Sequence, residues 1–349
     1  MTPGAAWTRY GEGFAGKLSS DGSHLVYSTF LSGTASAITV DAAGNAFVVG
    51  STYNSDFPST PNATMPCLPV VGHGDGSSYT YIVELNAAGT SLLYSGYSRN
   101  AIVATMAPGK YYVASDTALL DQMDILAPVE PGIRCIVNAA NYRGTAIGPG
   151  EIVAIFGPGI GPAQSAGAII DSSGKVATSV NNTRVLVGGI PAPLLYVAQN
   201  QINAVVPFGI VGQRLTPVQV ERNGIVSLPD FQEPVTNADP AFFTNDASGY
   251  GQAAVLNQDG TRNSERNPAA QGSVISLYVT GIGSMQPAPA DGFIPTAPFA
   301  KPALTVTLNI GGVQSDLMYV GDAPGLVEGA VVINALVPPV PQTGARGCN

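Results

Sequence analysis

Two related stretches, "PGEIVAIFGPGIGP" at 149–162 and "QGSVISLYVTGIGSMQP" at 271–287, decide how the second half of this chain is interpreted. Each is an apolar run that ends in a glycine cluster, which is also how a phosphate-binding loop begins. A dinucleotide site needs the spacing Gly-x-Gly-x-x-Gly and then a helix whose N-terminus faces the phosphates. Here prolines interrupt and follow the glycines of the first stretch, no amphipathic helix follows, and the second stretch changes the glycine spacing. Both stretches are therefore predicted to be β-strands that run into structural turns.

A longer repeat surrounds these two stretches. "TRVLVGGIPAPLLYVAQNQINAVVPFGI" (183–210) matches "LTVTLNIGGVQSDLMYVGDAPGLVEGAVVINALVPP" (304–339), with a period near 122 residues. Apolar residues alternate within both copies, as at Val185 and Val187, or at Leu304, Val306 and Leu308. Such alternation between Gly-Gly and Pro punctuation predicts half-buried strands. We expect two tandem Ig-like β-sandwiches, at 132–236 and 237–349.

The N-terminal part contains a different repeat. "GKLSSDGSHLVYSTF" (16–30) realigns 67 residues later with "VELNAAGTSLLYSGY" (83–97), which places Leu18 on Leu85, Gly22 on Gly89 and Tyr27 on Tyr94. Asp-Gly and Gly-Asn pairs supply the positive φ that tight hairpin turns require. Repeats of four short strands predict propeller blades, so residues 1–123 are interpreted as about two blade-like units. A proline-rich segment at 124–131 is the expected linker.

Both halves resemble known bacterial families. The strings "LVYST" and "VDAAGNAFVVGST" within residues 10–120 resemble the SBBP-type β-propeller repeat of bacterial surface proteins. From "CIVNAANYRGTAIGPGEIVAIFG" onward, residues 132–349 resemble an uncharacterised C-terminal domain abundant in Solibacter-type bacteria, a pair of Ig/TIG-like modules. The resemblance implies a secreted or surface architecture and no chemistry. The chain departs from the first family in having only about two repeats, whereas a closed propeller needs several blades.

Composition supports an all-β fold and restricts the partners. Among 349 residues there are 42 Gly and 28 Pro, and charged residues make up only 11%. The net charge is −9 and the few Lys and Arg are scattered, which argues against nucleic acid as a partner. No apolar run of about 18 residues predicts a membrane span. No signal peptide is visible at the start of this sequence, yet the composition is typical of a secreted protein. We therefore expect an extracellular or cell-surface location and interpret the chain as a fragment or processed form.

The sequence contains no recognisable catalytic motif, so we expect a protein that is not an enzyme and has no cofactor. Its two histidines, His24 and His73, are too few for a three-ligand zinc site. Four glutamates, at 84, 151, 221 and 328, are candidates for glycoside hydrolysis, but nothing in the sequence pairs them. Calcium is an alternative at Asp41–Asn45 or Asp259–Gly260, although these residues are also common in tight turns.

Cysteines and loop aromatics supply the remaining site candidates. Of Cys67, Cys135 and Cys348, the preferred disulfide is Cys135–Cys348, because both flank the C-terminal half. Most aromatic residues fall at repeated strand positions and are expected in the core. The loop tyrosines Tyr53 and Tyr250 leave glycan binding as an alternative.

The end of the chain suggests a function. The first C-terminal module continues with "TPVQVERNGIVSLP" (216–229), whereas the second reaches "INALVPPVPQTGARGCN" (333–349) and has no counterpart of that strand. An incomplete sheet exposes unpaired backbone groups, and the expected assembly edge is Ile333, Ala335 and Val337. We predict an extracellular structural protein that self-associates through strand edges, with filaments as one form; truncation of the sequence would also explain the open end. The alternative function is a surface module that binds glycan or peptide through its propeller-like part, with the sandwiches as a stalk.

Overall fold

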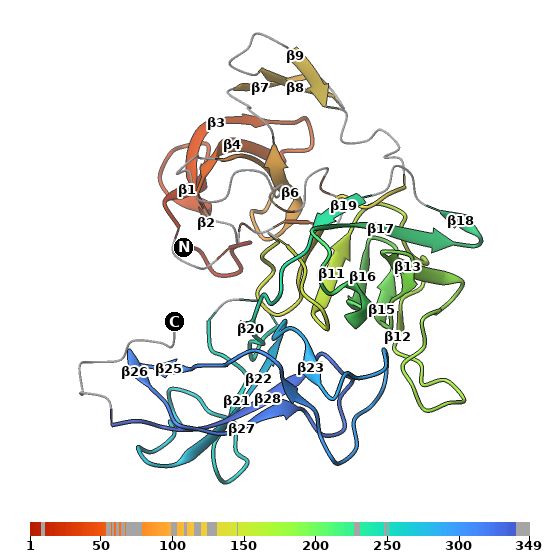
Figure 1. Cartoon of the computed structure of the whole chain (residues 1–349). Helices are drawn as coiled ribbons and strands as arrows, with labels where there is room; N and C mark the ends of the chain where they lie inside the picture. The colour runs from red at the N-terminus through yellow and green to blue at the C-terminus, as the bar shows by residue number, and fades with distance from the viewer. Residues whose placement is uncertain are drawn as a thin grey trace. The chain divides into compact units, whose positions relative to one another are not determined.

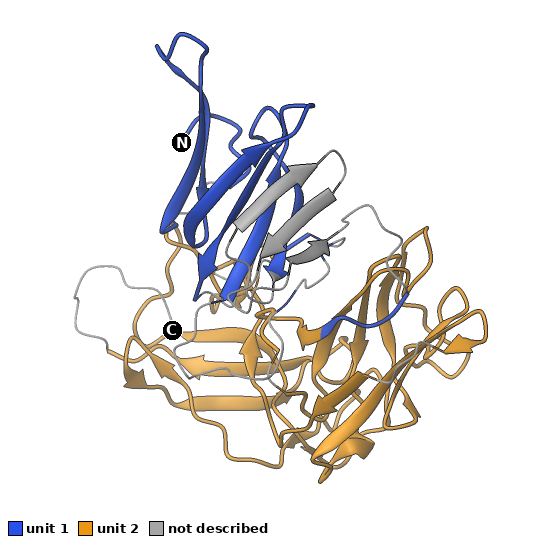
Figure 2. Ribbon diagram, turned by 90° about the horizontal axis from the view of Figure 1, so that it is seen from above, with its two compact units in different colours: residues 1–135 blue, residues 136–349 orange. Residues whose placement is uncertain are grey.

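The computed structural model describes residues 1–7, 11–53, 57, 59–60, 63, 67, 79–98, 103–107, 110–114, 120–123, 131–144, 146–226, 231–247, 249 and 251–339 (Figure 1). The chain forms two compact units, Met1–Cys135 and Ile136–Asn349, coloured separately in Figure 2. The described residues form antiparallel sheets, and their only helical element is a short 3-10 turn, η1 (Phe208–Ile210). The prediction of an all-β fold is confirmed. The expected linker at 124–131 lies almost wholly outside the described residues.

The first unit contains three sheets of consecutive strands. Their strands are β1 (Gly13–Leu18), β2 (Leu25–Leu31), β3 (Thr34–Val40), β4 (Ala46–Thr52), β5 (Tyr79–Leu85), β6 (Leu92–Ser98), β7 (Val103–Ala107), β8 (Lys110–Ala114) and β9 (Leu120–Met123). The sheet orders are β1-β2, β3-β4-β5-β6 and β7-β8-β9. All the pairs are antiparallel, as tight turns between successive strands require.

The predicted 67-residue repeat is confirmed in the strand registers. In the β1–β2 hairpin Leu18 pairs with Leu25 beside a register shift, and in the β5–β6 hairpin Leu85 pairs with Leu92 beside an equivalent shift. The repeated sequence thus specifies the same hairpin twice, including its irregularity. A buried cluster joins the β1–β2 hairpin to the four-stranded sheet, and its largest fully buried side chain is Tyr81.

The second unit begins with two five-stranded sheets, formed by a part that we call the first module (136–236). One sheet has the order β10-β11-β16-β15-β12, and the other has β14-β13-β17-β18 with β19 also paired to β17. The strands are β10 (Cys135–Asn138), β11 (Ile152–Phe156), β12 (Ala166–Gly167), β13 (Thr183–Val187), β14 (Ile190–Pro191), β15 (Leu194–Ala198), β16 (Gln201–Val205), β17 (Leu215–Arg222), β18 (Ile225–Val226) and β19 (Phe231–Pro234). Alternate side chains of both sheets, such as Ile155 and Val185, line one common interior.

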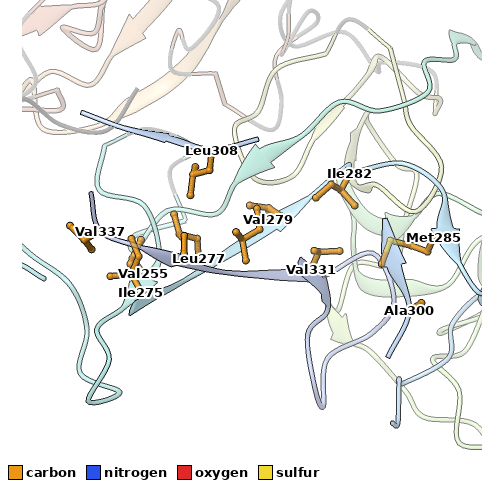
Figure 3. Packing of buried hydrophobic residues seen from close by; sticks show 12 residues of the cluster. Val255, Ile275, Leu277, Val279, Ile282, Met285, Ala300, Leu308, Val331 and Val337 are labelled. Carbon is orange, nitrogen blue, oxygen red and sulfur yellow. The ribbon is translucent and has the colours of Figure 1, made fainter. Parts of the chain in front are cut away.

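The second module (237–339) has one large sheet and two short hairpins. The sheet has the order β20-β22-β28-β27, with β21 also paired to β22; the hairpins are β23-β24 and β25-β26. The strands are β20 (Ala241–Phe242), β21 (Val255–Leu256), β22 (Val274–Thr280), β23 (Met285–Gln286), β24 (Lys301–Pro302), β25 (Asn309–Ile310), β26 (Val313–Gln314), β27 (Leu317–Asp322) and β28 (Val331–Leu336). Figure 3 shows the inner face of this sheet, with Leu308 facing Leu277 and Val279.

The glycine cluster after β11 forms a turn at residues 158–159, whereas the cluster after β22 is an irregular segment that leads to β23. Neither strand leads into a helix. Gly281 and Gly283 have φ values of +75° and +88°, and a Cβ at either residue would clash with backbone carbonyl oxygens of residues 239 and 237. These glycines are therefore needed for close backbone packing, and no phosphate-binding loop is formed.

The two modules pack against each other within the second unit. One buried apolar cluster combines Ile152 and Val205 of the first module with Ala323 and Val332 of the second. At the same junction the backbone N–H of Ile152 donates to Oγ1 of the buried Thr280 at 2.8 Å. The second unit is consequently one compact body made from two related halves.

Candidate functional site

The predicted assembly edge is wrong. Ile333 and Ala335 lie in β28, which is a central strand paired with β22 on one side and with β27 on the other. Val337 continues this pairing through backbone hydrogen bonds of 2.9 Å with Ser273 and Gly272. Because both sides of β28 are occupied, it offers no free backbone groups to a partner.

An open strand position lies elsewhere in the same module, and the first module reveals it. The two modules share a hairpin with identical register: Val187 pairs with Ile190 in the first, and Ile310 pairs with Val313 in the second. The hydrogen bonds beside these hairpins also correspond, since Ala192 N–H donates to Val185 O at 2.9 Å and Ser315 N–H donates to Leu308 O at 2.8 Å. Residues 183–187 and 306–310 are therefore structural counterparts.

The difference between the modules is on the far side of this hairpin. In the first module β17 pairs along the whole of β13, from Thr183–Arg222 to Val187–Val218. In the second, β25 pairs only with β26, and no strand among the described residues occupies the place of β17. Residues 304–308, which the sequence predicted as a strand, form none. We call residues 304–310 the acceptor segment.

Solvent exposure follows the same difference. Val185 is fully buried and Val187 is 2% exposed in the strand that pairs with β17, whereas their counterparts Leu308 and Ile310 are 8% exposed and half-buried. Leu308 nevertheless packs onto the core of the second module (Figure 3). The acceptor segment thus combines apolar side chains over a core with an unpaired strand edge, which is the combination that favours addition of a further strand.

The backbone of the acceptor segment shows which residue would pair with an added strand. The carbonyl of Leu308 accepts a hydrogen bond from Ser315 on the β26 side. In an extended antiparallel strand the backbone groups of successive residues point to opposite sides. The N–H and C=O of Thr307, an exposed residue, are consequently expected at the open edge.

The cysteine prediction is corrected by the structure. Cys135 forms a disulfide with Cys67, and their Cα atoms are 6.0 Å apart. Cys348, the partner expected from the sequence, lies outside the described residues. A separation of about 5.5–6 Å between Cα atoms suits a disulfide, and sequence position alone does not report that distance.

The other predicted ligand residues are not brought together. Tyr53 is 65% exposed in the first unit, while Tyr250 and His73 lie outside the described residues. Asp41 and Asp259 each accept hydrogen bonds within their own turns: Asn45 N–H donates to Asp41 Oδ1 at 2.8 Å, and Thr261 N–H donates to Asp259 Oδ1 at 3.0 Å. Among the described residues no group of three or more His, Cys, Asp or Glu side chains could hold a metal ion.

Buried glutamates are the feature that the sequence did not indicate. Glu151, Glu233 and Glu328 are 0–1% exposed, and at least one carboxyl oxygen of each lacks a hydrogen-bond partner. Burial raises the pKa of Glu233 to about 8 and that of Glu328 to about 8, with Asp322 also raising the latter. Burial, followed by the charges of Asp239 and Glu233, raises the pKa of Glu151 as well.

The other two glutamates considered from the sequence lie elsewhere. Glu221 forms an ion pair with Arg184 at 3.4 Å, and the carboxylate of Glu84 accepts a hydrogen bond from the side-chain amide of Asn45 at 3.4 Å.

No comparison with known proteins adds a functional residue. In the described part of the chain, no helix is long and apolar enough to cross a bilayer. No protein-family model matches the sequence, and searches of curated proteins and of solved structures find no match either.

Proposed function

We propose that this chain is a structural protein of the cell surface or extracellular matrix that self-associates through β-strand edges. The observation that carries the proposal is the contrast between the two modules. In the first, β17 pairs along the edge of β13, while the equivalent edge of residues 304–310 is unpaired in the described structure. We also propose that the role is non-enzymatic.

The proposed occupant of the acceptor segment is β3 of a second copy. This strand ends the four-stranded sheet of the first unit, so among the described residues its outer edge is unpaired. Ile38 and Val40 are 57% and 58% exposed, and they repeat the two-residue spacing of Val218 and Val220, the side chains of β17 that face the core in the first module. An exposed apolar edge strand is a ready template for pairing with another chain.

The geometry of this contact favours a polymer. The acceptor segment and β3 are different surfaces, so the contact is heterologous and each copy keeps one free donor and one free acceptor. Such contacts propagate head to tail unless the rotation between copies closes a ring. Filaments follow directly from a contact of this kind.

The first unit is proposed to be a run of propeller-type blades. Its sheets of two, four and three strands correspond to the end of one repeat, a whole repeat and the start of the next. The repeated hairpin register supports this interpretation. The two C-terminal modules are proposed to be Ig-like sandwiches, because facing sheets with alternating apolar residues enclose a shared core in the first of them.

The disulfide of the first unit supports the proposed surface location. The Cys67–Cys135 disulfide is of the kind that persists outside the cytosol. The scarcity of Lys and Arg within a net charge of −9 agrees with it.

The test is the association state of the purified chain, measured by light scattering after size-exclusion chromatography and by negative-stain electron microscopy. Wild type is expected to form open-ended oligomers. Thr307→Pro removes the N–H at the acceptor edge, and the double variant I38K/V40K places charges on the donor strand; each is expected to be monomeric. Ile225→Lys changes a side chain that is 75% exposed outside both surfaces and serves as the matched control, with assembly unchanged.

Mixing the two defective variants gives the sharper result. T307P retains a donor and I38K/V40K retains an acceptor, so their mixture should form a one-to-one dimer and nothing longer. A monomeric wild type, or a mixture that stays monomeric while each variant is folded, would contradict the proposal.

A further inference from the structure

A second surface of the same module has the composition of a ligand site. On the outer face of the large sheet, eight residues surround an open groove of about 590 Å³: Ser276, Tyr278, Phe299, Tyr319, Pro324, Leu326, Val332 and Asn334. This volume lies within the usual range of about 300–1,000 Å³ for small-molecule sites. The groove is on the face of the sheet opposite to Leu277, Ile333 and the rest of the core.

The floor of the groove is a regular grid across three strands. Ser276 of β22, Asn334 of β28 and Tyr319 of β27 are neighbours in register and form one row. Tyr278 and Val332 form the next row, together with Gly321. This row packs against Ile152 and Val205 of the first module, so the groove opens beside the junction of the two modules. Because the backbone groups of this central strand are already used in the sheet, a ligand meets side chains there and not free strand edges.

Tyr319 provides a fixed aromatic ring on this floor, which we call the platform. A Cβ at Gly321 would lie 2.6 Å from the hydroxyl oxygen of Tyr319, so the absence of a side chain at residue 321 makes room for the ring along the sheet. The hydroxyl then donates a hydrogen bond to the carbonyl of Asp322 at 3.1 Å. The ring is thereby fixed before any ligand arrives, which lowers the entropic cost of binding.

Hydrogen-bonding groups lie beside the aromatic rings. Ser276 Oγ donates to Asn334 Oδ1 at 2.8 Å, and this bond orients the amide so that Nδ2 is the remaining donor. Within the described residues Nδ2 of Asn334 and the hydroxyl of Tyr278 make no hydrogen bond that would occupy them. No Asp, Glu, Lys or Arg lines the groove, so a charged ligand would find no counter-charge.

In the first module the equivalent face of the sheet is filled by apolar side chains. Ala154 and Phe156 take the places of Ser276 and Tyr278; Ala154 is fully buried, and the ring of Phe156 lies 6.4 Å from that of Tyr142. The counterparts of Tyr319 and Asn334, Tyr196 and Asn203, are retained in the same register. Only the second module therefore combines the platform with an open, polar space above it.

We propose that this groove binds a neutral oligosaccharide, with a sugar ring stacked on Tyr319 and its hydroxyl groups hydrogen-bonded by Asn334, Ser276 and Tyr278. Aromatic faces contact the C–H faces of sugar rings, while amides and hydroxyls recognise their O–H groups. An uncharged lining selects uncharged sugars. The site is separate from the acceptor segment, so it adds ligand binding to the proposed assembly and does not depend on it.

The experiment uses the full chain and four series of neutral oligosaccharides, from two to six units: gluco-oligosaccharides with β-1,4 or α-1,4 linkages, manno-oligosaccharides and N-acetylglucosamine oligomers. Isothermal titration calorimetry is expected to detect binding of at least one series. Tyr319→Ala should weaken that binding at least tenfold, while Tyr319→Phe, which keeps the ring, should change it less than about threefold. Phe14→Ala is the matched control, because this aromatic side chain is 69% exposed in the first unit, and it should bind like wild type.

Leu326→Ala is a second test of the groove, which keeps the proposal testable if Tyr319→Ala does not fold. Leu326 is 43% exposed on the wall of the groove, so its truncation leaves the core intact and should still weaken binding. Absence of binding by every neutral series, or equal binding by wild type and both groove variants, would overturn the proposal. Binding of a proline-rich peptide in the groove without any oligosaccharide would also overturn it.

Discussion

The aromatic ring of Tyr27 lies directly against the turn glycine Gly89, which is the counterpart of Gly22 one repeat later. Gly89 has φ +69° and Gly22 has φ +71°, but no atom lies within 4 Å of the Cβ position at Gly22. The two glycines thus share a backbone conformation and differ only in whether a tyrosine covers them.

Replacing each glycine by alanine separates backbone strain from packing. Gly22→Ala should cost about 1 kcal/mol of stability, because only the positive φ is unfavourable. Gly89→Ala should cost about 3 kcal/mol, since the new methyl group must also displace a buried ring. Urea denaturation followed by the fluorescence of Trp7, the single tryptophan and a residue of the same unit, measures both. Equal losses in the two variants would show that Tyr27 does not cover Gly89.

The carboxyl of Glu233 should make the second unit less stable as the pH rises. Its folded pKa of about 8 lies above the ordinary value of 4.5, so between these values the folded state holds a proton that the unfolded state has released. Glu233→Gln removes this linkage. The stability of the variant relative to wild type should therefore increase by about 2–4 kcal/mol from pH 5 to pH 8.5. Denaturation curves of both proteins at four pH values test this, and a constant difference would contradict it.

Thr280 should be essential for the junction of the two modules. Thr280→Val leaves the buried N–H of Ile152 without an acceptor, which costs about 1–3 kcal/mol. Thr280→Ser keeps the hydroxyl and should cost less. Differential scanning calorimetry measures both losses. A valine variant as stable as the serine variant would mean that the hydrogen bond at the junction contributes nothing.

The disulfide predicts a specific pattern of thiol modification. Non-reducing peptide mapping should recover a crosslink between Cys67 and Cys135, with Cys348 alkylated as a free thiol. Replacing both bonded cysteines by serine should destabilise the first unit by about 2–4 kcal/mol, because the bond closes a loop of 68 residues. A crosslinked peptide containing Cys348 would restore the pairing first expected from the sequence.

Local features could be predicted from the sequence because neighbouring residues determine them. The Asp21-Gly22 hairpin, the alternation of Val185 and Val187 and the turn after β11 are all set within a few residues, and the structure has them. The 67-residue repeat also follows, because identical hairpins need identical turn residues.

Pairing between distant segments could not be predicted in this way. The alternating pattern at Ile333 and Ala335 suits a central strand as well as an edge strand, and the choice depends on β22 and β27. The groove was missed for the same reason, since the hydrogen-bonded pair Ser276 and Asn334 is separated by 58 positions. The sequence nevertheless contained an indication of the groove. At the outward positions of β22 the second module has Ser276 and Tyr278, where the first module has Ala154 and Phe156.

The matching registers of the two modules indicate duplication of one ancestral unit, and duplication relaxes the demand on each copy. The first copy keeps Val185 and Ile202 fully buried and closes its second sheet with β17. The first copy can therefore stabilise the tertiary structure of the pair while the sequence of the second copy diverges. Because the second copy packs on the first, the residues of its outer face could then change under selection independently of the fold.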